Sequence, residues 1–204
     1  MILACMLSLL APAIAQAGLD EAIAAYNAKD YAAAAAQFLP LAKAGNPSAQ
    51  NRLAHLYMQG QGVDRDPDAA ILWWRKAADQ GHATAQFNLS IAYGIGAGVA
   101  RDATEAQRWL RKSAEQGFAP AQNVLASRYA LGLVVEKNEA LAVEWWFKAA
   151  AQGHAGAQLA LGDAYLSGKG VAAEQTEAAY WYRLSAAQGN AAAQDALRRL
   201  GLRW

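Results

Sequence analysis

The sequence predicts an all-α fold in which helical hairpins stack into a solenoid. The dipeptide Ala-Gln recurs at intervals of 36 residues, at Ala49-Gln50, Ala85-Gln86, Ala121-Gln122, Ala157-Gln158 and Ala193-Gln194. A fixed interval of this length is typical of repeat proteins, whose units bury their apolar faces by stacking on neighbours. The chain of 204 residues is 55% hydrophobic, and much of this content is Ala, which favours helices.

Other positions with the same interval define two helices in each repeat. In the first full repeat, Leu53 and Tyr57 share one face of a helix that is expected to end at Gly60. Asp66 suits the N-cap of a second helix, and Gly81 suits its C-terminal end. The second helices carry tryptophans in a two-residue register, at Trp73, Trp74, Trp109, Trp145, Trp146 and Trp181. We interpret this stripe as core; a ligand-stacking aromatic box is the alternative.

Two repeats depart from this pattern. Val134 stands where the other repeats have the second glycine of the loop, so this loop is expected to be strained or to follow another path. Glu174 stands at the N-cap position of the fourth repeat, where it is a poor cap, and Thr176 is the alternative cap.

Residues 1–17 differ from the repeats in composition. They carry no charge and end in Ala15-Gln16-Ala17, an A-x-A pattern typical of signal-peptide cleavage sites. The apolar run is shorter than the roughly 20 residues that a transmembrane helix requires. We expect residues 1–17 to be a signal peptide that lacks a basic start, and the mature protein to be periplasmic or secreted, without stable membrane insertion. A buried N-terminal helix is the alternative.

The complete repeat resembles the Sel1-like repeat, a subgroup of the tetratricopeptide superfamily. The shared pattern is A-Q-x-x-L-[GA]-x-x-Y-x-x-G-x-G-V-x-x-D-x-x-x-A-x-x-W-[WYL]-x-K-A-A-x-Q-G. A single solenoid is expected over residues 18–204. It comprises a tetratricopeptide-like hairpin at 19–45, Sel1-like repeats at 49–84, 85–120, 121–156 and 157–192, and a C-terminal capping helix at 193–204. The resemblance implies a right-handed α-solenoid with a concave groove, and a non-catalytic adaptor or scaffold role in the bacterial envelope.

The sequence offers little support for catalysis, a cofactor or a metal. His82 and His154 share one repeat position that Phe118 occupies elsewhere, so we interpret them as loop residues without a ligand. One cysteine-rich branch of the Sel1-like family is associated with β-lactamase activity, but this chain lacks the paired cysteines and the S-x-x-K motif. With a net charge of +1 and scattered charges, the composition does not favour nucleic acid. An enzyme of this branch and a structural envelope spacer remain as alternatives to the adaptor.

By analogy with tetratricopeptide geometry, the first helices of the repeats should line a groove that binds a protein or peptide. The residue types that vary between repeats are the candidates: Asn51, His55, Met58, Phe87, Ile91, Ile95, Asn123, Ser127, Leu131, Leu159, Asp163 and Leu166. Phe87, Ile91, Ile95, Leu131 and Leu159 would form an exposed apolar strip, typical of a peptide-binding groove. Burial of some of them between helices is the alternative.

Overall fold

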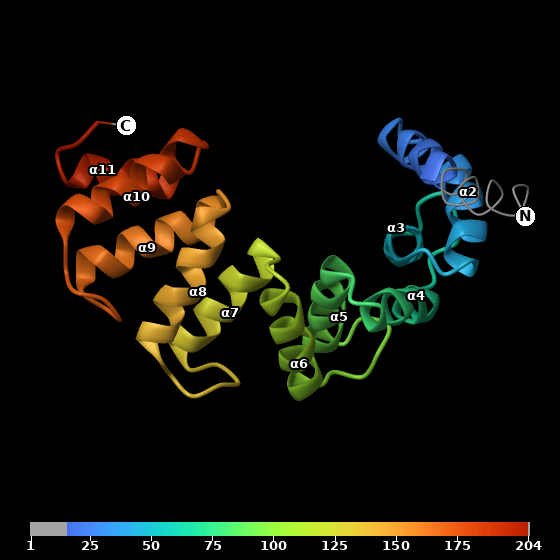
Figure 1. Ribbon diagram of the computed structural model, residues 1–204, viewed down its shortest axis with the longest axis horizontal. Coiled ribbons are helices and arrows are strands. Elements are labelled where there is room, and N and C mark those ends of the chain that lie inside the picture. Colours follow the sequence, from blue (N-terminus) through green and yellow to red (C-terminus); the bar gives the residue numbers. More distant parts are fainter. Residues whose placement is uncertain (1–15, 204) are drawn as a thin grey trace, which may run out of the picture. The chain divides into compact units, whose positions relative to one another are not determined.

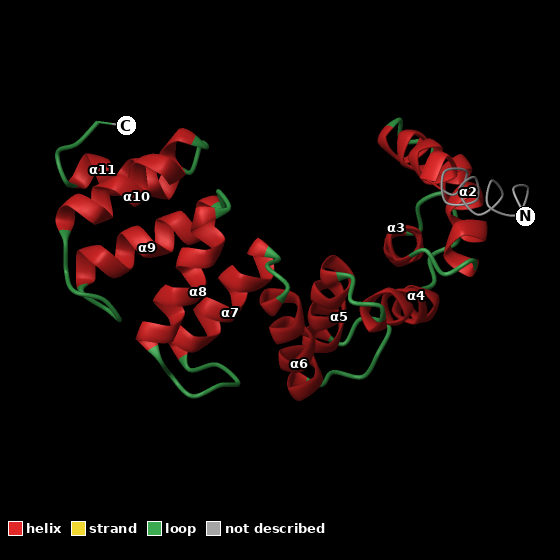
Figure 2. Cartoon of the chain, viewed as in Figure 1, coloured by secondary structure: helices red, strands yellow, loops and turns green. Residues whose placement is uncertain are grey.

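The computed structural model describes residues 16–203, and within them every regular element is a helix (Figure 2). The predicted all-α class of stacked helical hairpins is confirmed for this part of the chain. Residues 1–15, which hold most of the expected signal peptide, lie outside the described residues.

The chain divides into two compact units, and the boundary between Ala106 and Gln107 falls inside a helix. The first unit contains a helix over residues 16–27 and then the helices α2 (Tyr31–Lys43), α3 (Pro47–Gln59), α4 (Pro67–Asp79) and α5 (Ala83–Ile95) (Figure 1). Helix α6 (Ala103–Glu115) crosses the boundary. The second unit continues with α7 (Ala119–Leu131), α8 (Glu139–Ala151), α9 (Ala155–Ser167), α10 (Gln175–Ala187) and α11 (Ala191–Arg199).

We call α3, α5, α7, α9 and α11 the A helices, and α2, α4, α6, α8 and α10 the B helices. Each A helix starts two residues before its Ala-Gln pair, because the capping residue stands earlier than the sequence pattern suggested. The last A helix, α11, runs over Ala191–Arg199, so the expected C-terminal helix at 193–204 begins and ends earlier.

The glutamine of each Ala-Gln pair ties its A helix to the preceding B helix, and Gln50, Gln122 and Gln158 also tie it to the following one. Its amide nitrogen donates to a carbonyl near the end of the preceding B helix, as from Gln50 to Ala42 at 3.0 Å and from Gln158 to Ala150 at 3.2 Å. At these three positions its amide oxygen accepts from the glutamine that ends its own hairpin, as in Gln188 to Gln158 at 2.8 Å. Gln50, Gln86, Gln122 and Gln158 are all buried, so these hydrogen bonds satisfy side chains that water does not reach.

The leucines that recur every 36 residues and most of the tryptophans form the core, as predicted. Leu53, Leu89, Leu125, Leu161 and Leu197 are fully buried, and Trp73, Trp74, Trp109 and Trp181 are buried. Trp145 and Trp146 are only half-buried, so the third repeat is less tightly covered than the prediction implied. Lysines one turn after the first tryptophan lie over its ring, as with Lys76 on Trp73 at 4.3 Å and Lys148 on Trp145 at 4.0 Å.

The loop of the third repeat has the same backbone conformation as the other loops, although Val134 replaces the glycine. Val134 has φ of 66°, close to the 70° of Gly62 and the 74° of Gly170 at the same position. A β-branched residue rarely adopts this left-handed conformation, so the expected strain is present. In the fourth repeat, Glu174 stands at the N-cap without a side-chain cap hydrogen bond, and Thr176 lies inside α10, so the alternative cap at Thr176 is wrong.

His82 and His154 are helix N-caps, which corrects their interpretation as passive loop residues. The backbone amide of Ala85 donates to His82 Nδ1 at 3.2 Å, and that of Ala157 donates to His154 Nδ1 at 3.1 Å. Asn46 and Asn190 fill the same position and cap through their amide oxygens. The position therefore selects a side-chain acceptor in these repeats, and Phe118 is the exception because its side chain has none.

The histidine caps predict that stability falls with acidification. Burial lowers the pKa of both rings below the ordinary value of 6.5, because removal from water disfavours the charged imidazolium. A ring protonated on Nδ1 also cannot accept the capping hydrogen bond. The unfolded chain then binds more protons than the folded chain, so stability is complete above about pH 6.5 and declines as the pH falls below it. The thermal midpoint of the wild type is expected to drop between pH 7.5 and 5.

The double variant His82→Asn/His154→Asn should lose part of this pH dependence while retaining its stability at pH 7.5, because Asn caps the same position at Asn46 and Asn190. The remaining dependence of stability on pH is expected from His55, which is present in the variant and whose pKa is also lowered by burial. Identical pH profiles for the variant and the wild type would contradict the role of the two caps.

Candidate functional site

The candidate groove residues all lie on A helices, but they differ in exposure. In the first unit, α3 carries Asn51, His55 and Met58, and α5 carries Phe87, Ile91 and Ile95. In the second unit, α7 carries Asn123, Ser127 and Leu131, and α9 carries Leu159, Asp163 and Leu166. Four apolar side chains are exposed, namely Ile91 at 45%, Ile95 at 72%, Leu131 at 67% and Leu166 at 44%.

Phe87 and Leu159 do not belong to an exposed strip, contrary to the prediction. Both are half-buried, and Leu159 packs against the buried cluster that contains Tyr182 and Leu197. They occupy the same repeat position, one turn before Ile91 and Asp163, where the helix face turns toward its neighbours. Asn51 and Asn123 share this position and are also half-buried. Among the candidate groove residues, the exposed apolar side chains are therefore restricted to the later turns of α5, α7 and α9.

A pocket of about 440 Å³ opens between α3, α4 and α5 in the first unit. Trp74 forms part of its wall, and Ile91 and Ile95 line it from α5. Arg65, in the loop of the same repeat, also lines it and donates from Nε to the carbonyl of Met58 at 3.1 Å. Four of the residues predicted from the sequence meet here: His55, Met58, Ile91 and Ile95. The pocket thus combines an apolar wall with one cation.

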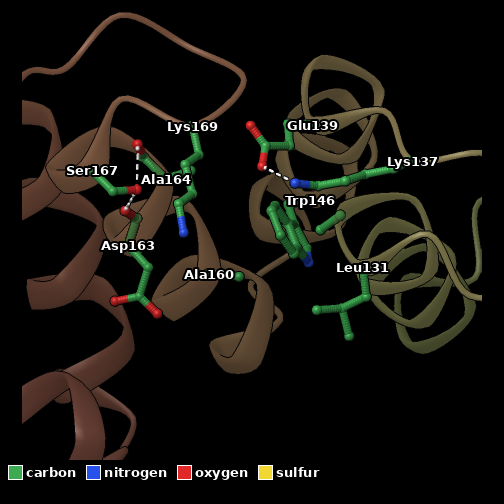
Figure 3. A pocket seen from close by; sticks show the side chains of 10 residues that line it. Leu131, Lys137, Glu139, Trp146, Ala160, Asp163, Ala164, Ser167 and Lys169 are labelled. Atoms are coloured by element: carbon green, nitrogen blue, oxygen red, sulfur yellow. Dashed lines mark hydrogen bonds and ion pairs between the residues drawn. The ribbon is translucent and has the colours of Figure 1, made fainter.

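The second unit repeats this pocket two repeats later, with a different lining. It encloses about 370 Å³ between α7, α8 and α9, and Trp146 and Lys137 stand where Trp74 and Arg65 stand in the first unit. Asp163, Ser167 and Lys169 replace Ile91, Ile95 and Ala97. Figure 3 shows Asp163 and Lys169 on one side of the pocket and Trp146 with Leu131 on the other. The two units therefore have a pocket at the same place in the repeat, lined by different side chains.

Three of the four charged side chains that line the second pocket, Lys137, Glu139 and Asp163, have side-chain partners. Lys137 Nζ pairs with Glu139 at 2.8 Å, and the hydrogen bond from Lys137 lowers the pKa of the Glu139 carboxyl. The Tyr182 hydroxyl donates to Asp163 at 2.7 Å, and burial together with this bond raises the pKa of Tyr182. The sequence analysis missed the Tyr182–Asp163 contact, because nothing in the repeat pattern signals a pair that joins two helices.

A second, polar pocket of about 480 Å³ lies in the first unit between the helix over residues 16–27, α3 and α5. His55 and Asn51, both predicted from the sequence, line it together with Arg52, His82 and Asn88. The Tyr26 hydroxyl lies 3.3 Å from His55 Nδ1, and Asn88 Nδ2 donates to Asn51 Oδ1 at 3.1 Å. Burial, followed by the charge of Arg52, lowers the pKa of His55.

Aromatic side chains on the B helices form a further exposed surface that sequence reasoning missed. Phe147 of α8 and Tyr180 of α10 are both exposed. Each packs edge-on against the ring of Trp181, with centroids 5.8 Å and 5.1 Å away. The signal was present in the sequence, because Arg75 and Arg111 occupy the position of Phe147 in the two preceding repeats.

The part of the chain that the structure describes offers no group of three or more His, Cys, Asp or Glu that could hold a metal ion. Over residues 16–203, no helix combines the length and the apolar character that a membrane span would need.

Comparison with known proteins identifies the repeat. The model of the Sel1 repeat matches residues 47–82, 83–118, 119–154 and 155–190, so each match begins where an A helix begins. These boundaries lie two residues before those expected from the Ala-Gln pairs. No curated protein sequence matches the chain.

Solved structures show the same architecture. A Sel1 repeat protein from Oxalobacter formigenes has 35% identity and a TM-score of 0.81, covering 83% of this chain and 49% of its own. A protective antigen of uropathogenic Escherichia coli has 36% identity and a TM-score of 0.80, covering 88% of this chain and 39% of its own. This chain therefore spans less than half the length of either. An immunity protein from Pseudomonas aeruginosa, at 23% identity with a TM-score of 0.60, covers 90% of this chain and 68% of its own and shares the fold.

Proposed function

We propose, since this chain belongs to the Sel1 repeat family, that it is a non-catalytic module that binds a protein or peptide through its A helices. Sel1 repeats commonly mediate protein–protein interaction, which makes a protein the first class of partner to consider. A scaffold role in the bacterial envelope is part of the proposal.

The observation that carries the proposal is the exposure of large apolar side chains at positions that the repeat core does not use. Ile91 and Ile95 lie one turn apart on α5 and line the same pocket. The equivalent positions on α9 are Asp163 and Ser167, so the fold does not require isoleucine there. Exposed apolar side chains beside a hollow are typical of surfaces that bind a partner.

The proposal predicts that binding and stability separate at α5. Ile91→Glu should abolish capture of the partner and shift the thermal midpoint by no more than about 2 °C, because the side chain is exposed. Proteins captured from envelope extract by the wild type and lost with Ile91→Glu would be purified, and their direct binding would be measured by calorimetry.

Phe87→Glu is the matched control on the same helix. Because Phe87 is half-buried, this change should lower the thermal midpoint by several degrees whether or not the surface binds anything. A large loss of stability in Ile91→Glu, or unchanged capture by it, would contradict the proposed surface. Turnover of a chromogenic β-lactam that follows the purified protein would favour the enzyme of the cysteine-rich branch instead.

Export is the second part of the proposal. It is supported by the uncharged apolar start and by the Ala15-Gln16-Ala17 pattern. N-terminal sequencing of protein from a periplasmic fraction should give an end near Gly18. Recovery of the uncleaved chain from the cytoplasm, from the native gene expressed with its own upstream sequence, would contradict export.

A further inference from the structure

The polar pocket of the first unit contains a cation that the fold does not require. Arg52 lies on α3 and is half-buried, and no ion pair joins it to any of the residues 16–203. Its guanidinium carbon lies 5.6 Å from the centroid of the Tyr26 ring. Val124 and Ala160 occupy its position in later repeats, so neither packing nor the repeat pattern demands an arginine there.

The side chains around Arg52 are donors, and none of them is a carboxylate. The pocket is lined by Asn51, His55, His82 and Asn88 on its polar side, without Asp or Glu. The Nδ1 atom of His82 accepts from the backbone of Ala85, so its neutral ring carries a proton on Nε2 and can donate from there. Asn51 accepts from Asn88, which leaves its own amide hydrogens available.

The pKa shifts of His55 and His82 also favour an anion in this pocket. The charge of Arg52 contributes, after burial, to lowering the pKa of both His55 and His82. Within the described residues this positive field has no opposing carboxylate in the pocket lining. An anion bound beside Arg52 would offset the field and stabilise both rings in the protonated form.

From this arrangement we infer that the pocket is a binding site for a carboxylate carried by a peptide, held by the Arg52 guanidinium and the amides of Asn51 and Asn88. Arginine binds a carboxylate through paired hydrogen bonds, which fits a single cation surrounded by neutral donors. The helix over residues 16–27 adds Leu19 and Ile23 to the lining, and these apolar side chains suit the residues that flank the carboxylate in a peptide. The volume of about 480 Å³ exceeds what a free small anion would fill. The inference deepens the proposed protein-binding function by naming the chemistry of one subsite.

Three short peptides test the site and distinguish the two sources of a carboxylate. Ac-Leu-Glu-Leu-NH2 carries it on a side chain, Ac-Leu-Gln-Leu-OH carries it at the C-terminus, and Ac-Leu-Gln-Leu-NH2 carries none. Each would be titrated into the isotope-labelled full chain, following the Arg52 Nε–H and the side-chain amides of Asn51 and Asn88 by NMR. At least one carboxylate peptide should shift these signals saturably and raise the pKa of His55, and the neutral peptide should do neither.

Arg52→Val is the test variant. Valine already occupies this repeat position at Val124, so the variant should fold. It should weaken the binding of the carboxylate peptide at least about tenfold, since a hydrogen-bonded charge is lost. Arg101→Ala removes the same charge from an exposed loop of the same unit and should leave binding unchanged.

Binding of the neutral peptide Ac-Leu-Gln-Leu-NH2 as tight as that of both carboxylate peptides, saturation by inorganic phosphate alone, or an affinity of Arg52→Val within twofold of the wild type would overturn the inference. These results test only the carboxylate subsite, whereas the Ile91→Glu experiment tests the proposed protein-binding function. A partner captured through Ile91 whose affinity ignores Arg52 would leave the protein-binding function standing and remove only this subsite.

Discussion

The buried glutamine of the Ala-Gln pair is the interaction on which the rest of the structure depends. A single side chain on each A helix donates to the preceding B helix and, at Gln50, Gln122 and Gln158, accepts from the glutamine at the end of the following one. The accepting carbonyl also takes a backbone bond from the glycine after its helix, as Ala42 does from Gly45 at 3.1 Å, so the group that would be costly to leave unpaired is the buried glutamine amide itself. Any insertion within the repeat would separate the donor from its acceptors, which gives a physical reason for the constant interval.

Because glutamine, leucine and tryptophan positions fix the stacking, the exposed positions of the A helices are free to vary. The same hollow between neighbouring A helices is lined by Ile91 and Ile95 in the first unit and by Asp163 and Ser167 in the second. In the second unit, Lys137 pairs with Glu139, and Asp163 accepts from Tyr182. In the first unit the exposed isoleucines and Arg52 have no such internal partners among the described residues. This contrast is why we place the proposed binding surface there.

Comparison of equivalent positions in the repeats predicted much of the local structure, and contacts that join different helices were missed. The helices, the leucine core and the strain at Val134 follow from comparing a position with its equivalents in other repeats. The histidine caps were within reach of the same comparison, because Asn46 and Asn190, both good capping residues, share their position. Phe87 was misplaced because its exposure depends on how neighbouring A helices pack, which the spacing within α5 does not reveal. The Arg52 pocket joins residues from three helices, so only the tertiary structure brings Tyr26, Arg52 and Asn88 together.

A double-mutant cycle on Gln158 and Gln188 tests the role of the glutamine brace most directly. Gln158 is buried and accepts from Gln188 at 2.8 Å, so Gln158→Ala should cost about 1–3 kcal/mol of unfolding free energy in a denaturant titration. Gln188→Ala should cost less, since Gln188 is exposed. The two losses should overlap by about 0.5–1.5 kcal/mol, because the single variants remove the same bond. Strictly additive losses, or a Gln158→Ala variant as stable as the wild type, would contradict the account.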